Sequence, residues 1–256
     1  MSGRHEARHR ETPRKTDSLW LFGTHAVAAA LDNPHRRLLR FLATGEAAAH
    51  IEAHLDALAG GGAPRLERAE RDDIERLLPP GAVHQGVALL ARPLPAVHID
   101  EMALGGGAPL VVLDRARDPR NVGAVIRSAA ALGAAAVIVP KRHAPEESGT
   151  LAKAASGALE RVPLVRAANL ARTLGALKET GYWCIGLDAG AERTLADTDA
   201  GGNIALVLGS EGGGLRRLTR ETCDTLARLP MGQGTDSLNL SVAAAIALYE
   251  LARQRR

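Results

Sequence analysis

Short apolar runs alternate with helical patterns along the second half of the chain. The runs "PLVVLD", "AAVIVP", "YWCIGLD" and "NIALVLGS" are rich in Val, Ile and Leu, and "VPLVRA" is a weaker fifth run. Runs of this kind, separated by helical segments, are typical of parallel strands that are buried on both faces of a sheet. The pattern therefore predicts a mostly parallel α/β sheet in a domain over residues 109–256.

The pattern of the first half predicts a smaller α/β domain over residues 18–92. In "LFGTHAVAAALDNP", Thr24 is placed to cap a helix that must end by Pro34. The segments "LLRFLAT" and "HQGVALLARPL" have the composition of strands, and "EAAAHIEAHLDALAGGG" between them predicts a helix closed by glycines. The proline- and glycine-rich stretch "ARPLPAVHIDEMALGGGAP" follows, so we expect a linker over residues 93–108.

The composition agrees with a folded protein. Of 256 residues, 46% are hydrophobic and 24% are charged, which is the balance of a globular chain. No uncharged apolar run is long enough to predict a membrane helix, and residues 1–17 lack the apolar core of a secretory signal. We expect a disordered basic tail over residues 1–17, a cytoplasmic protein, and buried thiols at Cys184 and Cys223 rather than a disulfide or zinc site.

Positive charge is spread unevenly along the chain. The formal net charge is only +3, but arginines gather in the tail, and Arg36, Arg37 and Arg40 form a second cluster. Such clusters suit a polyanion such as RNA and equally suit a solvated surface, so charge alone does not decide. Aromatic residues are only 2% of the chain, which argues against base-stacking platforms. If RNA binds, we expect contacts through charge and backbone shape.

The first informative loop follows the run "VVLD". In parallel α/β sheets, ligands bind beyond the carboxyl ends of the strands. In "LDRARDPRNVGAVIRSAAALGA", Asp118 can cap a helix, Asn121 lies near its start, and Arg127 follows nearly two turns later. Arg127 stands in an apolar stretch, where a charge is rarely unpaired. It should meet a carboxylate, a phosphate or a subunit interface, or else be a surface residue of an amphipathic helix.

Two further loops carry glycine. "VLGSEGGGL" follows a buried strand, and its glycines allow main-chain amides to approach a ligand, while Glu211 is an acid that a simple turn would not need. It matches neither a P-loop, nor a dinucleotide fingerprint, nor a nucleophile elbow. In "LPMGQGTDSLNLSVAAAIALYEL", Ser237 and Asn239 stand where a polar loop enters a helix that is apolar nearly all round, so we expect the helix to be buried. Asn239 could cap that helix or line a site.

Together these three loops resemble, in order and spacing, the signature motifs of the SpoU (TrmH-like) branch of the SPOUT methyltransferases. The motifs are "NVGAVIR", "LGSEGGGL" and "PMGQGTDSLNLSVAAAIALYE". The segments "FGTHAVAAAL" and "HQGVALLARP" resemble the ribosomal-protein-like RNA-binding domain of the RlmB group. The resemblance implies a catalytic domain of the α/β-knot class, in which the C-terminal part of a parallel sheet threads a deep trefoil knot, and an obligate homodimer.

The resemblance also implies a reaction and a site. A methyl group would pass from S-adenosyl-L-methionine to a ribose 2′-hydroxyl of RNA, with no metal. Arg127 matches the family's catalytic arginine; because a guanidinium stays protonated, we expect it to hold a phosphate or the developing oxyanion rather than to act as a base. The other implied catalytic residues are Asn121, Glu211, Ser237 and Asn239. The implied cofactor-binding residues are Gly209, Leu229, Met231, Ser237 and Leu238.

Several alternatives stay open. The two-domain organisation favours a guanosine of large-subunit (23S) ribosomal RNA as the substrate, and transfer RNA is the second choice. A non-catalytic RNA-binding relative would not need Asn121, Arg127, Glu211 and Asn239 together. A nucleotide-dependent oxidoreductase is disfavoured because its phosphate-binding fingerprint is missing.

Overall fold

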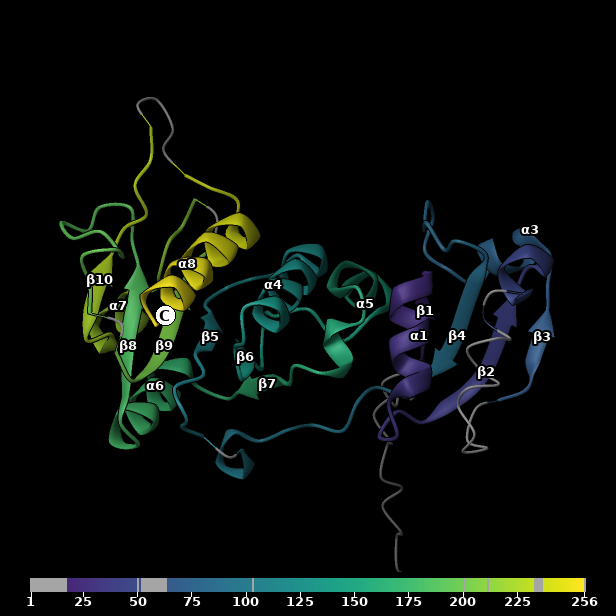
Figure 1. The fold of residues 1–256 in the computed structure, drawn as a ribbon, viewed down its shortest axis with the longest axis horizontal. Helices are drawn as coiled ribbons and strands as arrows, with labels where there is room; N and C mark the ends of the chain where they lie inside the picture. The colour runs from purple at the N-terminus through teal and green to yellow at the C-terminus, as the bar shows by residue number, and fades with distance from the viewer. Residues whose placement is uncertain are drawn as a thin grey trace, which may run out of the picture.

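The chain folds around two separate β-sheets (Figure 1). The computed structural model describes residues 18–49, 51, 64–102, 104–199, 201–210, 212–232 and 237–255. Three predictions fall outside these residues: the basic tail 1–17, most of the helix predicted over residues 46–62, and any role of Glu211.

The first sheet has four strands in the order β1-β4-β2-β3. β4 pairs antiparallel with β1 and β2, and β2 pairs parallel with β3. Its elements are β1 (Leu19–Phe22), α1 (Thr24–Asp32), β2 (Leu38–Ala43), β3 (Leu66–Arg68), α3 (Arg71–Glu75) and β4 (Val87–Ala91). The predicted strands β2 and β4 are confirmed, and α1 ends before Pro34 as expected. The predicted cap at Thr24 is wrong: Gly23, with φ +86°, takes the cap position and Thr24 is already helical.

The second sheet has six strands in the order β10-β8-β9-β5-β6-β7, and every pair is parallel. The strands are β5 (Leu110–Leu113), β6 (Ala136–Pro140), β7 (Leu164–Ala167), β8 (Tyr182–Leu187), β9 (Asn203–Leu208) and β10 (Thr225–Ala227). The predicted parallel sheet and its five apolar runs are confirmed.

Helices cover both faces of this sheet. They are α4 (Pro119–Ala131), α5 (Gly149–Ala155), α6 (Leu170–Glu179), α7 (Arg217–Thr222) and α8 (Leu240–Gln254), with 3-10 turns at η1 (Ile99–Glu101) and η2 (Ala158–Glu160). Alternate strand residues enter two cores: Val111 and Leu206 pack with α4 and α8, whereas Val112 and Ala205 pack with α6. Because successive strand residues point to opposite faces, continuous apolar runs are needed to fill both cores.

The prediction that α8 is buried nearly all round is wrong for the single chain. Ala244, Ala247, Leu248 and Leu251 are buried, and they face the core that α8 shares with α4. The opposite face exposes three large side chains: Val242 is 45% exposed, Ile246 43% and Tyr249 61%. The helix therefore covers the sheet with one apolar face and presents a second apolar face outward.

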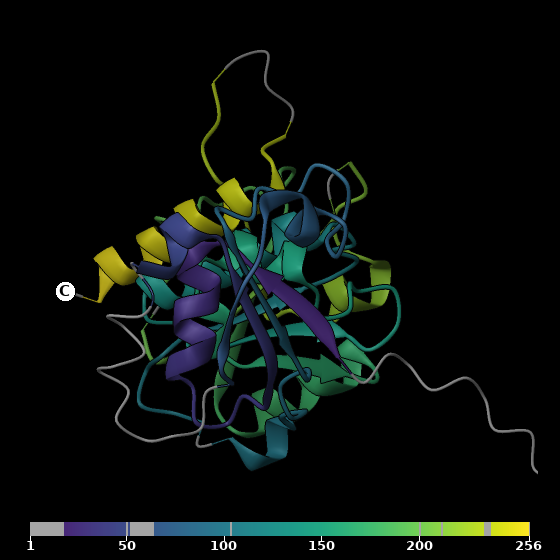
Figure 2. The same ribbon diagram turned by 90° about the vertical axis from the view of Figure 1, so that its right-hand side faces the viewer.

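The two sheets are joined by a close contact between β1 and α1 on one side and α5 and η2 on the other (Figure 1). Figure 2 shows the molecule end-on, with the first sheet toward the viewer. A Cβ atom at Gly149 would lie 2.1 Å from the carbonyl oxygen of Trp20, so only glycine allows this approach. The charge pattern predicted that Arg36 lies on the surface, either to bind a polyanion or to face solvent. In the structure Arg36 is only 4% exposed. Its guanidinium donates to Glu147 and Glu160 across the contact, because a charge buried there needs carboxylate partners.

Candidate active site

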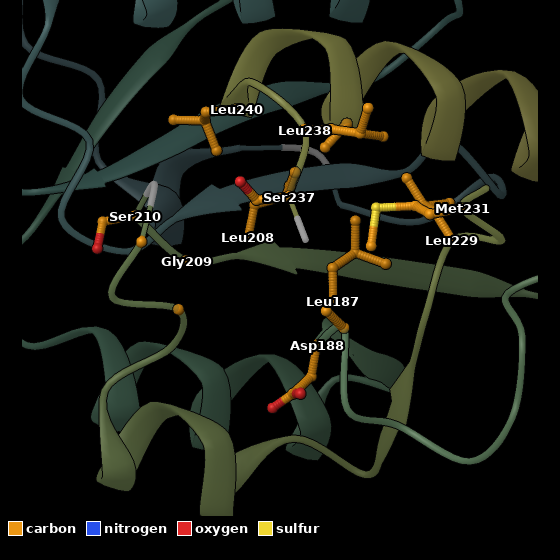
Figure 3. Close-up of a pocket in the computed structure, with 14 residues that line it drawn as sticks. Leu187, Asp188, Leu208, Gly209, Ser210, Leu229, Met231, Ser237, Leu238 and Leu240 are labelled. Carbon is orange, nitrogen blue, oxygen red and sulfur yellow. The ribbon is translucent and has the colours of Figure 1, made fainter. Parts of the chain in front are cut away.

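A cavity of about 310 Å³ opens where β8 and β9 end (Figure 3). Its walls come from the ends of both strands, from the glycine loop after β9, from the segment after β10 and from the start of α8. All five residues predicted to bind the cofactor line it, namely Gly209, Leu229, Met231, Ser237 and Leu238. Four chain segments between Leu187 and Ala243 thus meet at one point, at the edge of the sheet where ligands of parallel α/β folds bind.

The glycine loop closes tightly on itself. The N–H of Ser210 donates to the carbonyl of Gly214 at 3.1 Å, and the N–H of Gly214 donates back to Ser210 at 3.0 Å. A Cβ atom at Gly209 would lie 2.1 Å from the carbonyl carbon of Gly214. Glycine is therefore required at position 209 because the returning main chain occupies the place of a side chain. Glu211, between these residues, lies outside the part of the chain that the structure describes.

Asn239 both caps α8 and contacts the first motif. Its Oδ1 accepts the N–H groups of Ser241 at 2.9 Å and Val242 at 3.4 Å, which satisfies donors at the helix start. Its Nδ2 donates to Oδ1 of Asn121 on α4 at 3.0 Å. Ser237 instead lines the cavity (Figure 3). The two possibilities left open by the sequence are thus divided: Asn239 caps the helix and joins Asn121, while Ser237 faces the pocket.

Arg127 lies apart from the cavity. It is an exposed residue of α4, and no hydrogen bond or ion pair joins it to any other described residue. The predicted cap of α4 is confirmed, because Oδ1 of Asp118 accepts the N–H of Arg120 at 2.8 Å, with Pro119 in the first turn. The carboxylate partner considered for Arg127 is thus absent from the described residues of this chain, and its side chain is available to a ligand or to another subunit.

Two carboxylates at this edge of the sheet were not predicted as site residues. Asp188, which follows β8, lines the cavity and accepts a bond from Nε of Arg220 at 2.9 Å. Asp114, which follows β5, is fully buried and binds Nε of Arg216 at 2.6 Å. Both follow an apolar strand directly, and that position was the signal available in the sequence.

The remaining reactive groups are structural. Cys184 is buried as expected, whereas Cys223 is half-buried, and both are free thiols. Burial raises the pKa of each thiol to about 12. Among the described residues, no three His, Cys, Asp or Glu side chains gather as metal ligands. None of the described helices is long and apolar enough to cross a membrane.

The lining of the cavity restricts what it can bind. Leu187, Leu208, Leu229, Leu238 and Leu240 give apolar walls, and no lysine or arginine is among the described residues that line them. Within the described chain, the main-chain groups of Leu229 and Leu238 form no hydrogen bond with other main-chain groups, so they can serve a ligand. A flat base and its ribose suit such a site, whereas a nucleotide triphosphate would need cations.

Comparison with known proteins agrees with this geometry. A 23S rRNA (guanosine-2'-O-)-methyltransferase RlmB of Vibrio vulnificus is 40% identical over 245 residues, covering 92% of this chain and 97% of that protein. The RlmB protein of Ralstonia nicotianae is 42% identical over 239 residues, covering 92% and 95%. The AdoMet-bound crystal structure of the SpoU methyltransferase AviRb from Streptomyces viridochromogenes superposes with a TM-score of 0.77 at 26% identity, covering 93% and 91%.

Two family models cover most of the chain. The model for RNA 2'-O ribose methyltransferase substrate binding matches residues 20–97, and the model for the SpoU rRNA Methylase family matches residues 108–249. The fold class expected from the sequence, an α/β-knot catalytic domain preceded by a small substrate-binding domain, is thereby confirmed. The chain belongs to the SpoU rRNA methylase family.

Proposed function

We propose that this protein transfers a methyl group from S-adenosyl-L-methionine to the ribose 2′-hydroxyl of a guanosine in 23S ribosomal RNA. The observation that carries the proposal is the convergence of four chain segments on one apolar cavity at the carboxyl edge of the parallel sheet. Relatives about 40% identical over 92% of the chain carry this activity in their names, which favours 23S ribosomal RNA over transfer RNA.

The residues of the cavity fit the proposed cofactor. S-adenosyl-L-methionine supplies a methyl group that its sulfonium already activates, so the protein has mainly to hold and align the reactants. It carries no phosphate, in agreement with the described lining, which includes no lysine or arginine. We propose that the main chain at Gly209, Leu229 and Leu238 holds the adenosine, with Met231 and Ser237 beside it.

The polar motif residues then serve the RNA. Asn121 and Asn239 are hydrogen-bonded to each other at the start of α8, next to the cavity. Arg127 is exposed and has all its donors available within the described chain. Because a guanidinium does not give up its proton in proteins, we assign to Arg127 the binding of a phosphate or of the developing 2′-oxyanion. We assign Ser237 to the ribose side of the pocket. We also propose Glu211 as a catalytic residue, on the basis of the sequence motif alone.

We further propose that two copies of the chain pair through α8. The exposed face of Val242, Ile246 and Tyr249 is a cluster of large apolar side chains of the kind that marks an interface. A two-fold pairing would bury the same face on both chains. Because α4 packs directly against α8, such a dimer would bring α4 and Arg127 near the partner chain. We propose a cytoplasmic location, where ribosomal RNA is methylated, and domain limits at residues 18–92 and 109–256.

The test is methyl transfer from tritiated S-adenosyl-L-methionine to two purified RNAs, unmodified 23S ribosomal RNA and total transfer RNA. We expect one methyl group per 23S molecule and none in transfer RNA. Incorporation of the tritiated methyl group into transfer RNA alone would show that transfer RNA is the substrate. Cofactor binding without transfer to either RNA would support a non-catalytic relative and contradict the proposal.

A further inference from the structure

A second cavity, of about 540 Å³, lies where β6 and β7 end and α7 begins. We call it the basic cleft. Its polar lining consists of Arg142, His143, Asn169, Arg216, Arg217 and Thr219. Among the residues that the structure describes, no carboxylate and no aromatic ring other than the imidazole of His143 lines it. Four basic side chains from two distant segments therefore share one concave surface.

Hydrogen bonds from the second sheet fix both walls of the basic cleft. On one side, the buried carboxylate of Asp114 accepts two hydrogen bonds from Arg216, one from its main-chain N–H at 2.9 Å and one from its Nε at 2.6 Å. These bonds hold the start of α7 against the end of β5. On the other side, Nη2 of Arg166 on β7 donates to the carbonyl of Pro145 at 2.6 Å and holds the loop after β6. The basic cleft is thus part of the folded framework.

The cations of the basic cleft keep most of their donors for a ligand. Within the described chain, Arg142 and His143 form no hydrogen bond or ion pair, and both are exposed. Arg217 pairs with Glu221 one turn later, and these side chains are 77% and 55% exposed, so the pair is weak. His143 has φ +67°, a backbone conformation that is uncommon for residues other than glycine and that is found more often at functional sites.

The basic cleft and the candidate cofactor cavity lie next to each other along one loop. Gly209, Ser210, Gly212 and Gly214 line the cofactor cavity, and Arg216 and Arg217, which follow directly, line the basic cleft. A strand of RNA whose target ribose reaches the cofactor cavity would therefore pass close to the basic cleft with its neighbouring nucleotides.

We propose that the basic cleft binds backbone phosphates of the RNA strand that flanks the methylated nucleotide. This inference rests on the proposed RNA methyltransferase function. Arginine forks match the geometry of phosphate oxygens, and a site of this volume can hold a nucleotide. The lining offers no base-stacking platform, so the contact is to the backbone and positions the strand without selecting its sequence.

The test compares RNA affinity as a function of salt. The variant carries Arg142→Gln and Arg217→Gln together and keeps Arg216, which holds buried Asp114. The RNA is the 23S fragment that the wild type methylates best, or unmodified 23S if none is methylated, and binding is measured without turnover. We expect the slope of log affinity against log salt to fall by about 1.5, because each lost phosphate contact removes about 0.7 to 0.9. Affinity at low salt should fall about tenfold.

The control is Arg253→Gln near the end of α8, outside the substrate-binding domain and outside both cavities. Arg253 is an exposed arginine that pairs with Glu250 on its own helix, and these side chains are 56% and 17% exposed. We expect it to leave the slope unchanged, and neither variant should change cofactor affinity or melting temperature. If the double variant kept the wild-type salt slope, or if the slope of the control fell equally, the proposal that the basic cleft binds phosphates would be wrong. Failure of the wild type to methylate any RNA would instead overturn the proposed function, because binding is measured separately.

Discussion

Arg36 and Arg127 are two arginines that the structure places in opposite ways. Arg36, at the contact between the sheets, has a fully buried side chain that donates to Glu147, Glu160 and, at 3.0 Å, the carbonyl of Arg92. Arg127, on the outer face of α4, is exposed and has no partner in the described part of the chain. The difference shows what each can do: Arg36 is committed to joining the domains, and Arg127 is free to bind something else.

The pKa of Arg36 shows the same commitment. Burial alone would lower the pKa of this guanidinium, but hydrogen bonds and the charges of Glu160 and Glu147 outweigh burial and raise it above its ordinary value. The two cysteines are the opposite case, because burial and the charge of Asp224 outweigh the cation Lys178 and raise the pKa of both thiols, which keeps them neutral. Arg36 therefore stays charged because it has carboxylate partners, whereas the two thiols stay neutral.

The largest effect should follow from Arg36→Met. Removal of the guanidinium leaves Glu160, whose side chain is 4% exposed, without its main partner. We expect a loss of about 3 to 5 kcal/mol in the free energy of unfolding, because an uncompensated buried charge is costly. Urea denaturation followed by circular dichroism would measure it.

Arg40→Met is the matched control for this prediction. Arg40 pairs with Glu67 on the surface of the first sheet, where both side chains are nearly half exposed. We expect no measurable change in stability, because solvent screens such a pair. If the Arg36→Met and Arg40→Met variants were equally stable, the claim that Arg36 stabilises the contact between the domains would be wrong.

Arg127→Ala should affect catalysis and leave stability unchanged. We expect the rate of methyl transfer at saturating RNA to fall about a hundred- to a thousandfold, the range for removal of a group that stabilises developing charge. Cofactor affinity, measured by calorimetry, and the melting temperature should stay as in the wild type. Full activity in Arg127→Ala would show that the exposed arginine has no part in the reaction.

Asn239 allows capping to be separated from positioning. Asn239→Ala should cost about 1 kcal/mol of stability through loss of the α8 cap, whereas Asn239→Ser should keep the cap and the stability. Both variants lose the bond to Asn121, so both should show slower methyl transfer. Wild-type activity in Asn239→Ser would mean that Asn239 is only a helix cap.

The smallest effect is expected at the cysteines. With a pKa of about 12, only about one thiol in ten thousand is ionised at pH 8, so native Cys184 and Cys223 should resist iodoacetamide. Both should react fully in urea. Mass spectrometry would measure alkylation of the native protein. Rapid alkylation of either cysteine would contradict the prediction that both thiols are unreactive.

The sequence predicted those features that repeat along the chain or belong to a motif. The apolar runs of the second sheet are recognisable because burial on both faces leaves few polar positions, and the five predicted cofactor-binding residues lie within the second and third signature loops. The partners of Arg36 were not predictable, because Glu147 and Glu160 are more than a hundred residues away and only folding brings them together. The exposed face of α8 was missed because composition cannot distinguish a core from an interface.

The most direct test of the central claim is the chemical position of the methyl group. Treated 23S ribosomal RNA would be digested to nucleosides and analysed by mass spectrometry, and the site would be located by resistance of the adjacent phosphodiester to alkali. The proposed function predicts 2′-O-methylguanosine at a single position, present with the wild type and lost with Arg127→Ala. Methylation on a base, or on the ribose of another nucleoside, would contradict it.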